Sequence, residues 1–116
     1  MNLSMPVATA VADTRSPFTL YHVRGYRDAN GVTVLDGLPP LAAHSDRAII
    51  LDMSQVTFLD ASGVVALTAI GREVRGRLYV VNLCSFVDRL LRIMHLAPYL
   101  HIRDTISTAV AEIVNG

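Results

Sequence analysis

A short, unbroken run of aliphatic residues near the middle of the chain, Ala48-Ile49-Ile50-Leu51, limits the available folds more than any other feature. A strand with one face in solvent alternates apolar and polar side chains, whereas a strand with both faces buried is apolar throughout. The run therefore predicts a central strand over about residues 47–53, with other layers of the protein packed on both of its faces.

The sequence after this run alternates between helical and strand patterns. Val64, Leu67 and Ile70 recur at helical spacing, and a glycine at position 76 supplies a stop. By the same reasoning we predict helices over 64–75, from a cap at Ser85 to Pro98, and from Asp104-Thr105 onward, with strands over 77–83 and 99–102. In the second helix, the residues near one face are Phe86, Leu90, Ile93 and Met94. Such alternation predicts mostly parallel strands joined by right-handed crossovers.

Two regions precede the central strand. Residues 4–12 and 18–23 each alternate small or apolar positions around a turn-forming stretch, which predicts an antiparallel hairpin. The segment 25–45 is ambiguous, because its leucines suit a helix of about two turns ending near Leu38, whereas Asn30-Gly31 is a hairpin signal. We favour the helix. The expected fold is one α/β domain over 1–116, with a mixed sheet of four or five strands, an N-terminal antiparallel hairpin and about four helices.

Charge and composition argue against several classes of partner. Ten Lys plus Arg balance ten Asp plus Glu, so the cationic excess that drives nucleic-acid binding is missing. The apolar stretches of the chain fall short of the roughly 20 residues that cross a bilayer, so no membrane partner is expected. The N-terminus does not read as a secretory signal and Cys84 is the only cysteine, so a cytoplasmic protein is expected.

The sequence predicts no metal site, no cofactor and no catalytic activity. Its histidines, at positions 22, 44, 95 and 101, lack paired ligand spacing. A nucleophilic Ser62 or Asp60 would need a Gly-x-Ser-x-Gly elbow or an evident His partner, and neither is present. There is also no Gly-rich loop that would cradle a phosphate.

The sixteen residues Ile49–Val64, IILDMSQVTFLDASGV, resemble the signature of STAS domains of the anti-sigma-factor antagonist type. That family has an apolar strand, an Asp-Leu-Ser-like turn, Val-x-Phe-hydrophobic-Asp, and Ser-Ser-Gly-Leu opening a helix. The likeness extends to Gly25-x-x-Asp28, which is similar to Gly-Glu-Leu-Asp, and to the strand, loop and helix of 83–96, and it covers about residues 17–113. The chain departs from the pattern at three places: Ala61 replaces the first serine, Val64-Val65 replace Leu-Gly, and Tyr26-Arg27 replace Glu-Leu.

The resemblance implies a binding protein that is switched by phosphorylation. It maps the family's phosphate acceptor onto Ser62. It also implies that the unphosphorylated form binds an anti-sigma factor, which is the serine kinase as well. This binding releases a sigma factor. A phosphatase would reverse the modification. The partner-binding residues are expected to be Asp28, Asp60, Ala61, Ser62, Gly63 and Val64. The alternative is a constitutive STAS scaffold, never phosphorylated, within a sensory complex.

Elementary chemistry supports the same position for the switch. A serine at a strand-to-helix junction lies where free backbone N–H groups and the positive helix end meet solvent, so the fold tolerates a phosphate there. The phosphate adds about −1.5 to −2 charges beside Asp60 and disfavours a docked partner. On spacing alone, however, Asp60 and Ser62 are ordinary helix caps and Asp28 a turn residue. Asp52, at the end of the central strand, suits either a turn or assistance to phosphoryl transfer.

Overall fold

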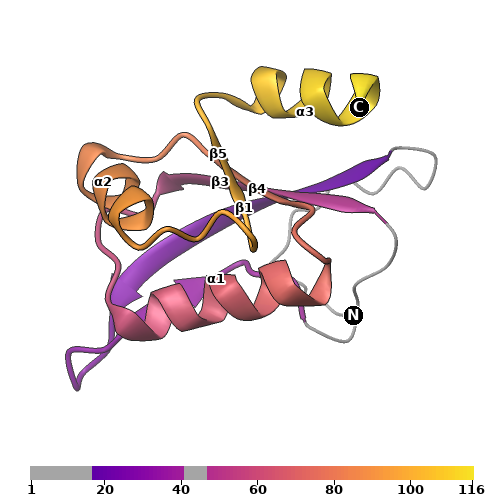
Figure 1. The fold of residues 1–116 in the computed structure, drawn as a ribbon. Helices are drawn as coiled ribbons and strands as arrows, with labels where there is room; N and C mark the ends of the chain where they lie inside the picture. The colour runs from indigo at the N-terminus through magenta and orange to yellow at the C-terminus, as the bar shows by residue number, and fades with distance from the viewer. Residues whose placement is uncertain (1–16, 41–46) are drawn as a thin grey trace, which may run out of the picture.

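The computed structural model describes residues 17–40 and 47–116, which form a five-stranded sheet with helices on both faces (Figure 1). The strands are β1 (Phe18–Arg27), β2 (Thr33–Asp36), β3 (Ala48–Gln55), β4 (Leu78–Val81) and β5 (His101–Arg103), and the helices are α1 (Ala61–Glu73), α2 (Ser85–Ile93) and α3 (Ile106–Asn115). The strand order is β2-β1-β3-β4-β5, with β2 antiparallel to β1 and the other pairs parallel. The predicted mixed sheet is confirmed, with β3 at its centre.

The central strand is buried on both faces, as its aliphatic run predicts. Ile49, Leu51 and Met53 belong to the large core that α1 and α2 cover, whereas Ile50 joins a smaller core with Ala109 of α3. Residues 48–51 are at most 6% exposed. Burying one such aliphatic side chain stabilises a fold by roughly 1.5–3 kcal/mol, so this strand anchors both layers. Within the described ranges, no helix combines the length and apolar composition of a membrane span.

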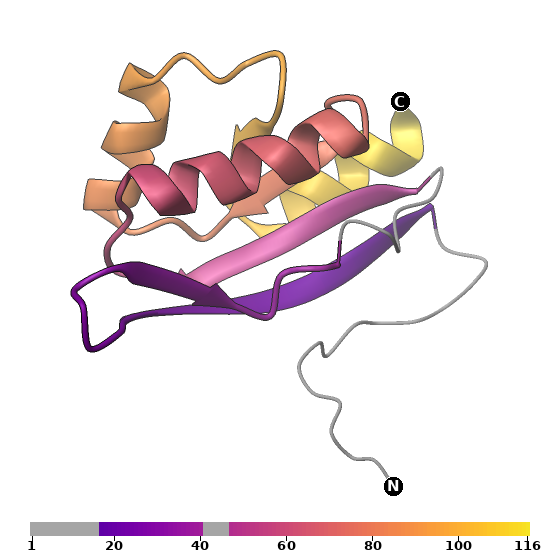
Figure 2. The ribbon, with the colours of Figure 1, turned by 90° about the horizontal axis from the view of Figure 1, so that it is seen from below.

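Helix α1 lies along one face of the sheet, as Figure 2 shows from below, and packs on it through one apolar stripe. Val64, Leu67 and Ile70 are buried in this stripe. At Gly71 the helix approaches the loop before β5 so closely that a Cβ atom would lie 2.1 Å from the carbonyl oxygen of Tyr99. Only glycine allows this approach of two backbones.

The helix favoured within 25–45 is wrong. The structure shows a hairpin, in which β1 continues to Arg27 and β2 begins at Thr33. The Asn30-Gly31 turn signal prevails over leucine spacing because Gly31 adopts a φ of +79° and the Asp28 carboxylate accepts hydrogen bonds from two N–H groups of the turn. This accounts for three helices in the described residues where about four were expected. The predicted partner of β1, residues 4–12, lies outside the described residues.

The start of α2 also differs from the prediction. Ser85 is its first helical residue, and the preceding Cys84 occupies the cap position without a side-chain hydrogen bond to the helix. The buried side chains of α2 are Val87 and Leu91. Phe86 and Ile93, which were expected to share an apolar face, are 49% and 62% exposed. The helix therefore leaves part of its apolar surface in solvent.

Candidate functional site

Ser62 lies where the connection from the central strand enters α1. Asp60 is the N-cap of this helix, and its Oδ1 atom accepts hydrogen bonds from the N–H groups of Ser62 and Gly63 at 3.1 and 3.3 Å. These N–H groups have no acceptor within the helix, so the carboxylate satisfies them. Ser62 itself is exposed. The capping role of Asp60 is thus real, and it holds the hydroxyl of Ser62 at the open end of the helix.

The same two residues bind the backbone of the edge strand β2. The Thr33 N–H donates to Asp60 Oδ2 at 3.1 Å, and the Ser62 hydroxyl lies 2.7 Å from Asp60 Oδ1 and 3.3 Å from the carbonyl oxygen of Thr33. An edge strand leaves one row of backbone groups without a strand partner, and here α1 supplies partners for one residue of that row. Because a hydroxyl has one proton, the shorter contact, to Asp60, is the stronger hydrogen bond. Figure 2 shows the start of α1 beside this hairpin.

The electrostatics at the helix start are dominated by Asp60. The hydrogen bond from the Ser62 hydroxyl, followed by that from the Thr33 N–H, holds the pKa of the Asp60 carboxyl far below its usual value. Asp60 is therefore ionised at neutral pH and acts only as an acceptor. It orients the Ser62 hydroxyl, but such a weakly basic carboxylate holds a proton poorly.

Asp52 lies in a separate hydrogen-bond cluster. Its carboxylate contacts His22 Nδ1 at 2.8 Å, Asn82 Nδ2 at 3.0 Å and the Ser54 N–H at 3.1 Å. Burial alone would raise the pKa of Asp52, but these hydrogen bonds outweigh it and lower the pKa. Side chains alternate along a strand, so Asp52 lies on the same face as Ile50, which packs against α3 and not α1. These contacts favour a structural role, and assistance to phosphoryl transfer stays a prediction.

The remaining predicted site residues divide by exposure. Asp28 and Ala61 are exposed, and Asp28 closes the hairpin turn that leads into β2. Gly63 and Val64 are buried and offer a partner little surface. A Cβ atom at Gly63 would lie 2.5 Å from Leu59 Cδ1, so this glycine admits the packing of Leu59 beneath the helix start. In the described part of the chain, no group of three or more His, Cys, Asp or Glu residues could hold a metal ion.

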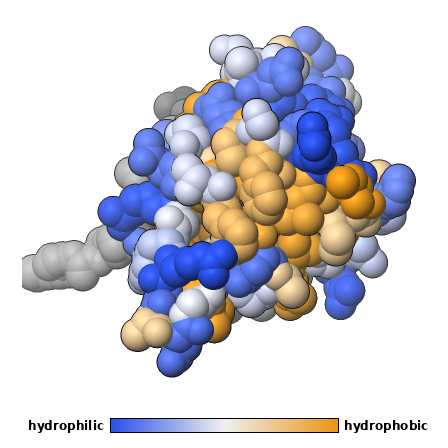
Figure 3. All heavy atoms as spheres, turned by 90° about the vertical axis from the view of Figure 1, so that its left-hand side faces the viewer, coloured by the Kyte–Doolittle hydropathy of each residue, from blue (hydrophilic) through white to orange (hydrophobic). Residues whose placement is uncertain are grey.

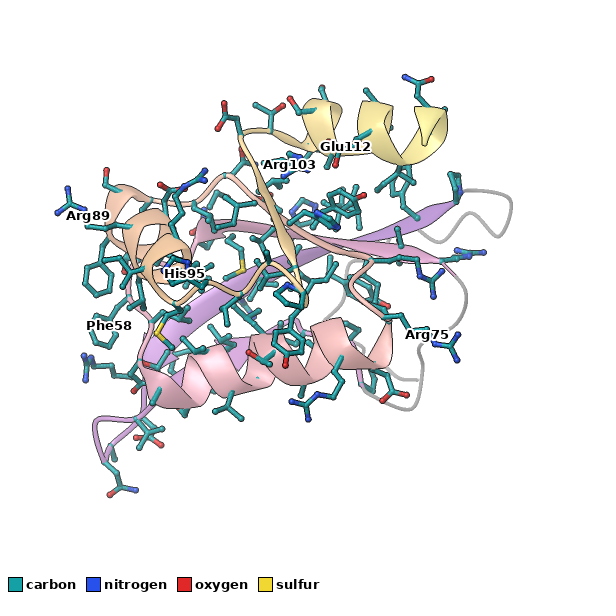
Figure 4. All side chains as sticks on the ribbon, viewed as in Figure 1. Phe58, Arg75, Arg89, His95, Arg103 and Glu112 are labelled. Carbon is teal, nitrogen blue, oxygen red and sulfur yellow. The ribbon has the colours of Figure 1, made fainter. Side chains whose placement is uncertain are left out.

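An apolar surface adjoins the start of α1, and the sequence did not predict it. The ring of Phe58, two residues before the cap, stacks on Phe86 of α2 with centroids 5.4 Å apart, and the guanidinium of Arg27 lies 3.9 Å above the same Phe58 ring. Figure 3 shows apolar residues gathered on the face of the molecule at the left of Figure 1, and Figure 4 places Phe58 and Arg89 at this end, beside α2. The sequence signal was the Phe58 of the family-like motif, but its stacking partner comes from a distant element.

Comparisons with known proteins agree with this geometry. A family model described as "STAS domain" matches residues 9–109. Among solved structures, an anti-sigma-factor antagonist (STAS) domain protein from Planctomyces limnophilus superposes with a TM-score of 0.52 at 15% sequence identity, covering 80% of this chain and 98% of that one. At this identity the second match shows a shared fold. The family model spans most of the chain, and we conclude that the protein belongs to the STAS domain family.

Proposed function

We propose that this chain is a cytoplasmic anti-sigma-factor antagonist with a binding role rather than a catalytic one. In its unphosphorylated form it binds an anti-sigma factor that is also its serine kinase, and so releases a sigma factor. Phosphorylation of Ser62 switches this binding off, and a phosphatase restores it. The observation that carries the proposal is the exposed Ser62 hydroxyl, held at the N-terminus of α1 by Asp60 and facing the backbone of β2.

The position of Ser62 suits a phosphate acceptor. In the transfer, Ser62 Oγ bonds to the γ-phosphorus of ATP, the bond from that phosphorus to ADP breaks, and the hydroxyl proton leaves. Asp60 accepts a hydrogen bond from this hydroxyl at 2.7 Å, so the hydroxyl proton points to Asp60 and the oxygen lone pairs stay unprotonated for attack. Because the pKa of Asp60 is far below its usual value, the kinase must supply the base that takes the proton.

A phosphate on Ser62 would change the surface more than the fold. The backbone N–H groups of Ser62 and Gly63 would keep their bonds to Asp60, so the cap of α1 would survive. The ester oxygen could no longer donate to Asp60 or to the Thr33 carbonyl, and about −1.5 to −2 charges would stand beside an ionised carboxylate. A partner docked over this end of the helix would meet like charge in a surface from which water is excluded.

The apolar surface beside Ser62 supports a protein as the partner. Phe86 and Ile93 are exposed on α2, and Phe58 connects them to the start of α1 through its stacking on Phe86. An apolar centre with charged residues around it is typical of protein–protein interfaces. Asp28, Ala61 and Ser62 would then form the switchable side of this interface.

The test is to incubate the protein with ATP and each anti-sigma kinase of the source organism, and to map the phosphate by mass spectrometry. We expect phosphate on Ser62 and none in Ser62→Ala. Ser85→Ala is the matched control, since Ser85 is also exposed at the start of a helix, and it should be phosphorylated like the wild type. Phosphate on Ser85 instead of Ser62 would contradict the assignment of the acceptor. Binding to an anti-sigma factor without phosphate transfer by any kinase would favour the constitutive scaffold.

A further inference from the structure

We propose that Arg27 is the intramolecular partner of a phosphate on Ser62. On phosphorylation its guanidinium leaves the ring of Phe58 and the carbonyl of Gly31 and pairs with the phosphate oxygens, with the hydroxyl of Thr33 as a second donor. The inference rests on the proposed function only in assuming that Ser62 carries phosphate. It adds a phosphate-holding site in the β1–β2 hairpin.

The register of the hairpin brings Arg27 to the site. Arg27 lies directly opposite Thr33 in the β1–β2 ladder. The N–H and C=O groups of Thr33 point outward to Asp60 and Ser62, so the two residues form a non-hydrogen-bonded pair, with Cα atoms about 4.5 Å apart. Side chains alternate along β1, and Arg27 therefore shares the face of the buried Val23, which is the face that α1 covers. Because Ser62 Oγ lies 3.3 Å from the carbonyl oxygen of Thr33, a long arginine side chain that starts opposite Thr33 can reach a phosphate on Ser62.

A small cavity beside Thr33 has room for phosphate oxygens. It has a volume of about 230 Å³ and is lined by Gly25, Tyr26, Arg27, Thr33, Thr57 and Phe58. Thr33 is 6% exposed, and within the described residues its hydroxyl is buried without a hydrogen-bond partner. A buried donor that lacks an acceptor is unfavourable, and a phosphate oxygen that entered this cavity would supply one.

The contacts that Arg27 makes in the unphosphorylated protein are weaker than those that a phosphate would offer. Its guanidinium lies 3.9 Å from the centroid of the Phe58 ring and donates one hydrogen bond, of 2.9 Å, to the Gly31 carbonyl oxygen. Among the described residues Arg24, Arg92 and Arg103 pair with carboxylates, and Arg27 does not. A bidentate pair with a phosphate dianion is stronger than a cation–π contact with one bond to a neutral carbonyl.

The positive charge of Arg27 would also offset the repulsion between a phosphate on Ser62 and the acidic side chain beside it. Asp60 lies 2.7 Å from Ser62 Oγ, so its carboxylate opposes a phosphate there. Arg27 is the cation that the hairpin places opposite Thr33, the residue whose backbone contacts both Asp60 and Ser62. The sequence resemblance puts a leucine at this position of the family pattern, so this pairing is a property of the present chain and not of STAS domains in general.

The experiment installs phosphoserine at position 62 during translation, so that neither a kinase nor a partner is needed. The ³¹P resonance is then followed through a pH titration in the wild type, in Arg27→Gln, and in the matched control Arg24→Gln. Arg24 is on the same strand but the opposite face, where it pairs with Asp36. Because a nearby cation favours the dianion, the midpoint in Arg27→Gln should lie above the wild-type midpoint by about 0.5 pH unit. Arg24→Gln should match the wild type.

A second readout follows the Arg27 side chain itself. In the unphosphorylated protein its protons lie in the ring current of Phe58, and phosphorylation should move their NMR resonances toward ordinary arginine values. Equal midpoints in Arg27→Gln and the wild type, or Arg27 resonances that do not move, would overturn the inference. Failure of the proposed function would look different, since the phosphorylated and unphosphorylated proteins would then bind the anti-sigma factor equally well whatever Arg27 does. Thermal melts verify that each variant is folded.

Discussion

Replacing Thr33 by valine should stabilise the protein, although Thr33 lies at the centre of the candidate site. Its backbone groups bond to Asp60 and Ser62, and a substitution leaves them in place. Its buried hydroxyl has no acceptor with the distance and angle of a hydrogen bond, and its interaction with Asp60 is the smallest of the causes that lower the pKa of that carboxyl. An unsatisfied buried hydroxyl costs about 1–3 kcal/mol, and valine keeps the β-branched shape. We expect a gain of about 1–2 kcal/mol, or roughly 4–10 °C in Tm.

The assay is urea unfolding of the wild type, Thr33→Val and the matched variant Thr33→Ser. The serine variant keeps the unpartnered hydroxyl and loses a buried methyl group, so its free energy of unfolding should fall by about 1 kcal/mol. The two substitutions should therefore act in opposite directions. If Thr33→Val is less stable than the wild type, the hydroxyl has a partner in solution, either Asp60 or an ordered water, and the reasoning fails.

Three further predictions concern the start and the packing of α1. Gly71→Ala should lower the free energy of unfolding in urea by about 3 kcal/mol, because its Cβ atom would lie 2.1 Å from the Tyr99 carbonyl oxygen and a backbone atom cannot move away as a side chain can. A variant with the same urea midpoint as the wild type would disprove the close approach. Gly63→Ala should cost only about 1 kcal/mol, because its Cβ would meet the movable side chain of Leu59 and alanine favours the helix; a loss as large as at Gly71 would contradict this. Folding lowers the pKa of Asp60, so its stabilising contribution is present above the unfolded value near 3.9 and is lost as the pH falls. Below about pH 4 the Tm of the wild type should therefore drop more steeply than that of Asp60→Asn. Parallel curves of Tm against pH for the two proteins would refute this stabilising role of the Asp60 charge.

The central part of the fold was predictable because its signals are local. The run at 48–51 shows burial on both faces without reference to any other segment, and the helical stripe of α1 is read within one helix. The β1–β2 hairpin was not predicted, because two local signals conflicted. Leu35 and Leu38 suit a helix, yet in the structure both pack against the large core from extended or irregular backbone. The turn at Asn30-Gly31 decided between them.

The candidate site was predictable only along one segment of the chain. Asp60 and Ser62 are neighbours in sequence, so a motif can reveal them. Thr33 lies 29 residues from Ser62, and its contact depends on β2 being the edge strand. The stacking of Phe86 on Phe58 depends in the same way on how α2 is placed. Contacts of this kind follow from the register of the sheet, which pattern and spacing do not specify.

The most direct test of the switch is calorimetric titration of the anti-sigma factor into four forms of the protein: the wild type, Ser62→Ala, Ser62→Asp and the protein with phosphoserine at position 62. Ser62→Ala removes the acceptor and should bind as tightly as the unphosphorylated wild type. Ser62→Asp should bind more weakly and the phosphoprotein most weakly, because the mimic carries one charge where phosphate carries nearly two. All four should remain folded, since Asp60 still caps α1. If the phosphoprotein and Ser62→Asp bind as tightly as Ser62→Ala, Ser62 is only part of the helix cap and the switch does not exist.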